Sequence, residues 1–291
     1  MKEASMGAPR MEGEVTRRGR RLRVQWNLWV GAAILVLLAA AALVSYVYVP
    51  HDPNRISIMD RFQPPGGDFP LGTDQFGRDL LSRLMVGSRV TILVGVMAVA
   101  IGLSAGLLVG GIAAQYGRWV DEGLMRIMDA LAAYPPLLLA ILLASIMGPG
   151  TVSGTLAIGM ATIPVFARLV RANFLTLLDA DFVHAARAAG ARNARILWRH
   201  LLPNTAAILL VQATITFANA ILAEAALSYL GLGTQPPHPS WGRMLREAQD
   251  FLVFSPYPAL WPGLAIAVTV LGLNLLGDGL RDVLDPKTRR R

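Results

Sequence analysis

The amino-acid sequence predicts an all-α, polytopic membrane protein with six transmembrane helices. The chain of 291 residues is 54% hydrophobic and only 16% charged, whereas a water-soluble domain carries roughly 25% charged residues. Six apolar stretches are each long enough to cross a hydrocarbon core of about 30 Å at about 1.5 Å per residue. The charges gather between those stretches, so the net charge of +8 does not indicate the soluble basic face that nucleic-acid binding needs.

The predicted spans begin after a basic tail at 1–25. The first span, at 26–49, follows the segment "RRGRRLR". Its apolar run exceeds the roughly 7–15 residues of a signal-peptide core, so we expect an uncleaved helix. The other five spans form a core at 88–281. They lie at about 90–114, 127–147, 152–170, 205–230 and 259–276.

Lysine and arginine predict the orientation, because cytoplasmic loops carry the excess of these residues. With the N-terminus inside, the inner segments hold 20 of the 27 Lys and Arg residues and the outer segments hold 7. We therefore expect both tails, at 1–25 and 282–291, in the cytosol. The longest cytosolic loop between spans, at 173–204, is expected on the same side.

The outer loop at 50–87 contains a second periodic segment, "FGRDLLSRLMVG". Phe76, Leu80 and Leu84 recur every four residues with polar residues between them, which predicts an amphipathic helix. This helix would either lie on the outer membrane surface or cover the ends of neighbouring spans.

In the second span, Gly102, Gly106 and Gly110 stand four residues apart. They share one face of the helix and let another backbone approach closely. Packing within the chain and contact with another subunit would both use such a face.

The residues of common catalytic and nucleotide sites are missing from the sequence. Lys2 and Lys287 are the only lysines, and neither lies in a G-x-x-x-x-G-K-[ST] phosphate loop. The sequence has no cysteine, no H-E-x-x-H zinc pair and no G-x-S-x-G nucleophile elbow. We therefore expect no enzymatic activity, cofactor or metal site in this chain.

Glu224 is the clear ionisable residue inside a predicted span. It lies about 18 residues past the cytosolic start of that span, or about 27 Å up, and hence near the outer edge. A local structural role near the helix end and a role in lining a translocation path are both open. An ion-coupled transporter would hold ionisable groups near mid-membrane, and the sequence shows none there.

The segment "HAARAAGARNARILWRHLLPN", at 184–204, predicts two short helices. Asp181 can cap the first helix, and Gly190 can end it in a left-handed conformation. Asn193 can cap the second helix, and Pro203 resists its continuation. A thin alanine-rich helix ringed by arginines suits a groove in another protein. A basic loop on anionic lipid would explain the arginines but not the spacing of Ala, Gly and Leu-Pro.

The same segment resembles the EAA motif of ABC-importer permeases. That motif reads Glu-Ala-Ala, three residues, Gly, nine residues, Ile, one residue and Leu-Pro. Here His184 begins the motif, Gly190 follows at the right spacing, and His200 precedes Leu202 and Pro203. His200 resembles the peptide-transporter branch. His184 in place of Glu removes a capping-box partner for Asp181.

Three more segments resemble the C-type subunit of the dipeptide/oligopeptide/nickel permease family. They are "LGTDQFGRDLLSRLMVGSRVT", "AILAEAALSYLGLGTQPPHPSWGRML" and "NLLGDGLRDVLDP". The resemblance implies the type I ABC-importer permease fold in a bacterial or archaeal cytoplasmic membrane. It also implies four partners: a homologous permease subunit, two ABC ATPase subunits that carry ATP and magnesium, and an extracytoplasmic substrate-binding protein.

The function that the resemblance implies is translocation of di- or oligopeptides by ATP-driven alternating access. Nickel or another small solute is the alternative substrate within the same family. Contact with the ATPase is expected from the EAA-like segment, and a place on the translocation path is one of the two roles open to Glu224. The residues expected to couple to the ATPase are His184, Ala185, Ala186, Ala189, Gly190, Arg195, His200, Leu202 and Pro203.

Overall fold

The computed structural model describes the backbone of residues 9–284 and the side chains of residues 26–284. Residues 1–8 and 285–291, at the ends of the two predicted tails, lie outside the described residues. Every regular element within the described part is helical. The elements are α1 (Pro9–Val47), η1 (Ile58–Asp60), α2 (Leu80–Tyr116), α3 (Arg118–Ala132), α4 (Pro136–Met147), α5 (Thr151–Leu178), α6 (Asp181–Ala188), α7 (Asn193–Ile196), η2 (Leu197–Leu201), α8 (Leu202–Tyr229), α9 (Trp241–Ala248), η3 (Gln249–Phe251) and α10 (Tyr257–Leu284).

Five helical segments of the described chain are long and apolar enough to cross a membrane, and a bent pair gives a sixth if its two helices form one span. The five are α1 from Trp26, α2, α5, the continuous run of α7 to α8, and α10. The sixth is α3 with α4, which meet at 88°. The span predicted at 127–147 is therefore not one straight helix. Pro135 and Pro136 explain the break, because proline lacks an N–H and disfavours helical geometry in the residue before it.

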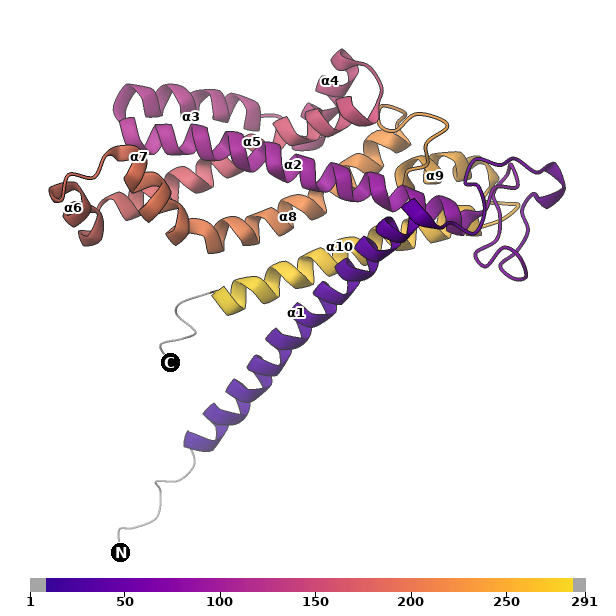
Figure 1. The fold of residues 1–291 in the computed structure, drawn as a ribbon, viewed down its shortest axis with the longest axis horizontal. Helices are drawn as coiled ribbons and strands as arrows, with labels where there is room; N and C mark the ends of the chain where they lie inside the picture. Colours follow the sequence, from indigo (N-terminus) through magenta and orange to yellow (C-terminus); the bar gives the residue numbers. More distant parts are fainter. Residues whose placement is uncertain (1–8, 285–291) are drawn as a thin grey trace, which may run out of the picture.

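Helices α1 and α10 extend beyond the predicted boundaries. Helix α1 begins at Pro9, inside the predicted tail at 1–25, and α10 ends at Leu284 rather than at 281. The two helices pack together from the C-terminal end of α1 down to Leu28, and they diverge only towards the N-terminal end of α1 (Figure 1). They approach closely at Gly31, where an added Cβ would lie only 2.6 Å from the carbonyl oxygen of Gly272.

The glycine stripe of α2 packs inside the chain, against α5, which runs beside it in Figure 1. An added Cβ at Gly106 would lie 2.4 Å from Cβ of Phe166, and one at Gly110 would lie 2.3 Å from the carbonyl oxygen of Ala167. Real Cβ contacts are never this short, so only glycine permits this helix pair to approach. Of the two uses predicted for the stripe, the structure shows packing within the chain.

The amphipathic helix predicted around 76–84 is not a separate element. Residues 76–79 are not helical, and α2 begins at Leu80 and runs directly into the second span. Asp79 caps α2 by accepting the Ser82 N–H at 3.1 Å. Leu80 and Arg83 are each only 1% exposed. The first turn of α2 is thus covered on its polar side as well as its apolar side, and it does not lie on a membrane surface.

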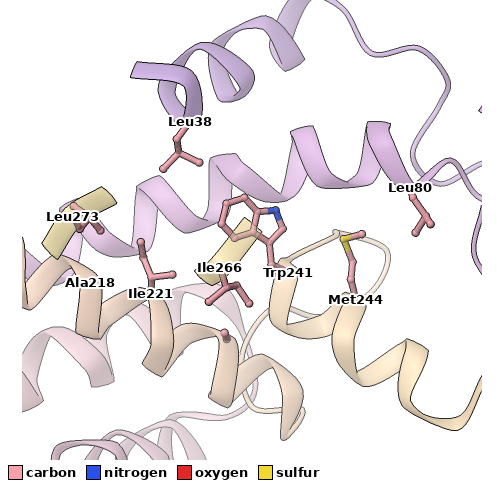
Figure 2. Close-up of a cluster of buried hydrophobic side chains, with 9 residues drawn as sticks. Leu38, Leu80, Ala218, Ile221, Trp241, Met244, Ile266 and Leu273 are labelled. Carbon is pink, nitrogen blue, oxygen red and sulfur yellow. The ribbon is translucent and has the colours of Figure 1, made fainter. Parts of the chain in front are cut away.

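A cluster of buried side chains joins α2 to α1, α8, α9 and α10 in the half of the molecule that contains α9. Figure 2 shows Trp241 of α9 among these side chains, near Ile266. The Trp241 indole N–H donates to the Leu84 carbonyl at 3.0 Å, so its polar end is satisfied while its rings are buried. The labelled members are Leu38, Leu80, Ala218, Ile221, Trp241, Met244, Ile266 and Leu273.

Candidate functional site

The EAA-like segment lies at one end of the helix bundle. Helices α6 and α7 connect α5 to α8 there, and the last turn of α10 lies towards the same end (Figure 1). The loop between α1 and α2 and helix α9 lie at the opposite end. The alternation of the spans thus separates the two predicted functional regions, at 173–204 and around Glu224, by the length of α8.

Helix α6 ends as the sequence predicts but begins differently. Gly190 has φ +80°. Its N–H donates to the Arg187 carbonyl at 2.9 Å, and the Ala191 N–H donates to the Ala186 carbonyl at 3.0 Å. These bonds form a Schellman motif that closes the helix. The predicted cap by Asp181 is wrong, because Ala180 occupies the cap position and Asp181 is the first helical residue. Its carboxylate still suits the positive end of the helix dipole.

Pro203 does not end the second short helix, contrary to prediction. Asn193 likewise does not cap it, because Arg192 holds the cap position and α7 begins at Asn193. Leu197–Leu201 form a π-helical turn, in which the Leu202 N–H donates to the Leu197 carbonyl five residues back. The wider turn relieves the clash that the proline ring makes in a regular α-helix. One helical rod therefore runs from Asn193 to Tyr229.

Three apolar side chains anchor the segment to the bundle. Val183 on α6, Ile196 on α7 and Leu201 in the π-helical turn are all buried, and they share one core cluster with Val170 and Phe174 of α5. Since the anchors belong to the same cluster as the spans, a displacement of α6 or α7 acts directly on α5 and α8.

The predicted coupling residues are mostly on the opposite, open face. Ala186, His200 and Leu202 are only partly exposed. Ala186 also contributes its carbonyl to the motif that ends α6, so Ala185 and Ala189 are the alanines that a partner could contact freely. The exposed members of the set are His184, Ala185, Ala189, Gly190, Arg195 and Pro203.

The open face is basic and partly apolar. Trp198 is 58% exposed and Phe182 is 41% exposed. Among the described residues, the four arginines of the segment have no ion-pair partner on their own chain. They are Arg187, Arg192, Arg195 and Arg199. An acidic or polar cleft on another protein would therefore find both charge and apolar surface here.

Glu224 lies near the C-terminal end of α8, buried at 4% exposure. Its Oε1 accepts the Ser228 hydroxyl at 2.7 Å, and the Ser228 Oγ in turn accepts the Thr234 N–H at 2.9 Å. The carboxylate thus ties α8 to the loop that leads into α9. The pocket beside it, lined in part by Thr151 and Thr155 of α5, has no room for a water molecule. In this conformation Glu224 does not face an open passage.

A buried ion network between α9 and the start of α2 was not predicted. Glu247 on α9 accepts Arg78 at 2.5 Å, Arg83 at 3.0 Å and Arg243 at 2.7 Å. Arg78 also binds Asp74 at 2.6 Å. Burial opposes ionisation of Glu247, but the guanidinium groups of Arg83, Arg78 and Arg243 outweigh it and hold the pKa of this carboxyl below its usual value. One indication of this network was present in the sequence. Several arginines lie in segments predicted to be outside, where the positive-inside rule expects few.

Comparison with known proteins agrees with this architecture. The family described as "Binding-protein-dependent transport system inner membrane component" matches residues 102–290. A putative peptide transport system permease protein of Brucella suis is 45% identical, over 93% of this chain and 91% of that protein. The dipeptide transport system permease protein DppC of Alkalihalophilus pseudofirmus is 41% identical, over 92% and 87%. The glutathione transport system permease protein GsiD of Pectobacterium atrosepticum is 41% identical, over 93% and 90%.

A solved structure shows the same fold. A chain of the MetNI methionine ABC transporter, in inward-facing conformations, matches with a TM-score of 0.52 at 19% identity, covering 67% of this chain and 91% of that chain. The predicted all-α permease fold is therefore confirmed, as is the multi-pass membrane character. With nine-tenths of its length matched by permease subunits, this chain belongs to the family of binding-protein-dependent transport system inner membrane components, the permeases of ABC importers.

Proposed function

We propose that this permease carries di- or oligopeptides across a bacterial or archaeal cytoplasmic membrane. The observation that carries the proposal is the chain's likeness, at 41–45% identity over more than nine-tenths of its length, to relatives named as peptide, dipeptide and glutathione permeases. Its partners would be a homologous permease, two ABC ATPase subunits that bind ATP and magnesium, and an extracytoplasmic binding protein. Surrounding lipid would cover the exposed apolar faces of the spans.

The EAA-like segment would dock into the ATPase and transmit its movement. The exposed alanines give α6 a low profile that fits a cleft, and the exposed arginines supply charge at its rim. Val183, Ile196 and Leu201 bind the segment to the core that holds α5 and α8. Motion at α6 would then travel along the rod from Asn193 to Tyr229 as a rigid-body tilt.

The nucleotide would supply the bias between inward-facing and outward-facing states. Only a ligand that binds the two states with different affinity shifts their equilibrium. Inverting a 1:99 population takes about 5.5 kcal/mol of differential binding free energy. Two ATP sites in the partner subunits would supply it. The 20:7 distribution of Lys and Arg supports placing the EAA-like segment and both termini in the cytosol.

For Glu224 we propose a structural role in place of a direct role in the path. Its carboxylate holds the Ser228 hydroxyl, and the Ser228 oxygen holds the Thr234 N–H. This chain of bonds would fix the loop into α9 against the outer end of α8. The tight packing around the carboxylate supports this choice over lining of the passage.

Uptake by reconstituted proteoliposomes tests the proposed function. The full complex, with its binding protein outside and ATP inside, should import radiolabelled trialanine and should not import nickel. Import that needs an ion gradient but no ATP would instead indicate a secondary transporter. Import of nickel without peptide would select the alternative substrate of the same family.

A further inference from the structure

Two side-chain amides lie exposed in the middle of membrane-spanning helices. They belong to Asn219 on α8 and Asn274 on α10. Each stands at least about ten residues, or about 15 Å, from either end of its helix. Within the described part of the chain, neither amide has a hydrogen-bond partner. A bare carboxamide in hydrocarbon is strongly unfavourable, so lipid tails are a poor environment for this surface.

The two asparagines lie on the same side of the α8–α10 pair and at nearly the same depth. Gly277 faces Thr214, because an added Cβ there would lie 2.5 Å from the Thr214 Oγ1. At about 100° and 1.5 Å per residue, Asn219 is turned about 140° from this contact and Asn274 about 60°. Because the helices are antiparallel, both rotations lead to the same side, and the two residues differ in depth by only about 3 Å.

The rest of this face is poorly suited to tight packing against another helix. Its exposed neighbours on α8 are Ile208, Ile215 and Leu222, and α8 contains no glycine. The close helix contacts within this chain are instead made at glycines, as at Gly106 against α5 and Gly277 against α8. Small residues are what allow helix backbones to meet in membranes. Asp278, one turn from Asn274, and Gln212, two turns from Asn219, add polar groups to this face, so it fits a passage better than a helix interface.

We propose that this face lines the passage for the substrate and that Asn219 and Asn274 exchange hydrogen bonds with the backbone amides of a peptide in transit. The inference rests on the proposed function as a peptide importer. A carboxamide presents one acceptor oxygen and an N–H₂ donor, which match the N–H and C=O of a peptide group whatever its side chains are. Both groups are neutral, so they bind the peptide backbone without an ionic contact of their own.

Thiol labelling tests whether the face is wet. The sequence has no cysteine, so Asn219→Cys and Asn274→Cys each introduce the only thiol of this subunit. A charged methanethiosulfonate reagent reacts with thiolates, which form in water and not in lipid. In the full complex in nanodiscs, we expect modification of this subunit to be at least about tenfold faster than in Leu37→Cys. Leu37 is an exposed residue of α1 and serves as the lipid-facing control. Trialanine and the binding protein should slow the reaction.

Rates no faster than that of Leu37→Cys, in both the ATP-bound and the nucleotide-free complex, would overturn the proposal. Reaction with a lipid-soluble maleimide alone would assign the face to lipid. Failure of both reagents would assign it to a contact with the second permease.

Transport variants test the hydrogen bonds themselves. Asn219→Leu and Asn274→Leu should each lower trialanine uptake about fivefold, which corresponds to about 1 kcal/mol, while Asn219→Gln should retain most of it. Wild-type uptake in both Leu variants would contradict the proposal. The wild-type complex is measured first. If it imports no peptide, the proposed function fails, whereas normal wild-type uptake with unlabelled Cys variants refutes the lining of the passage alone.

Discussion

Removing the charge of Glu247 should loosen the packing of α9 against the start of α2. Glu247→Gln leaves the guanidinium groups of Arg78, Arg83 and Arg243 without the carboxylate on which they converge. Arg83 is only 1% exposed, and breaking a buried ion pair by removing one partner costs about 3–5 kcal/mol. Asp74 still lies 3.7 Å from Arg83, so we expect the lower end of this range, about 3 kcal/mol.

Hydrogen exchange of the intact complex measures this effect locally. A loss of about 3 kcal/mol in local opening free energy corresponds to about a hundredfold faster exchange at residues 72–84 and 240–248, at about 1.4 kcal/mol per tenfold. Asp68→Asn, at an exposed position of the same outer loop, is the matched control and should change nothing. Adding Arg83→Met to Glu247→Gln should restore part of the protection, because it removes the most deeply buried of the three guanidinium groups that lost their carboxylate.

The same network should respond to acid. The pKa of Glu247 is lower in the folded protein than its ordinary value, so its contribution is fully present above the unfolded value of about 4.3 and is lost as the pH falls through the folded value. Wild-type protection at 240–248 should therefore fall below about pH 4, towards the level of Glu247→Gln. Unchanged exchange in Glu247→Gln at neutral pH, or no recovery in the double variant, would refute the reasoning.

Three further predictions concern the coupling segment and Glu224. Ala189→Trp should lower the recovery of tagged ATPase with the permease about tenfold to a hundredfold, because overpacking an interface costs about 1–3 kcal/mol. Ala132→Trp, at another exposed position, is the control. Equal recovery of ATPase with the Ala189→Trp variant and the control would exclude docking at Ala189. Gly190→Leu should uncouple ATP hydrolysis from uptake without affecting membrane insertion. Gly190 has φ +80° and open space around it, so the cost of the leucine is backbone strain of about 1–2 kcal/mol. The control Gly190→Asn should remain coupled, because asparagine tolerates this conformation. The Glu224→Gln permease should transport peptide at close to the wild-type rate, because the amide oxygen can still accept the Ser228 hydroxyl. If uptake falls while the binding protein still stimulates ATP hydrolysis, Glu224 instead lies on the translocation path.

The five long spans and their order could be read from the sequence because hydrophobic length is a local property. A run of about 20 apolar residues must cross the bilayer wherever the rest of the chain lies. The end of α6 at Gly190 was predictable for a similar reason, since a left-handed turn selects glycine through its own backbone. The EAA-like spacing is likewise contained within one short segment of the chain.

Predictions from sequence periodicity or from a single proline failed where contacts with other helices determine the local structure. Phe76, Leu80 and Leu84 have amphipathic spacing, but α9 supplies Glu247 to the polar side and buries it, so no surface helix forms. Pro203 was expected to end a helix, yet the π-helical turn before it accommodates the proline ring and the helix continues. Such local adjustments depend on the packing of Ile196 and Leu201 against α5, which one segment cannot specify.

The sequence by itself determined that this protein is a multi-span permease with a small, basic segment between the long helices α5 and α8. Only the tertiary structure decided what its isolated polar residues do. Glu247 and Arg83 lie far apart in the chain and meet because α9 folds back onto α2. Glu224 is held by a loop that returns to α8, while Asn219 and Asn274 face one open side because α8 and α10 pack in a single register at Thr214 and Gly277. Charges and hydrogen bonds act over a few ångströms, so their partners are defined by distance in space and not by distance along the chain.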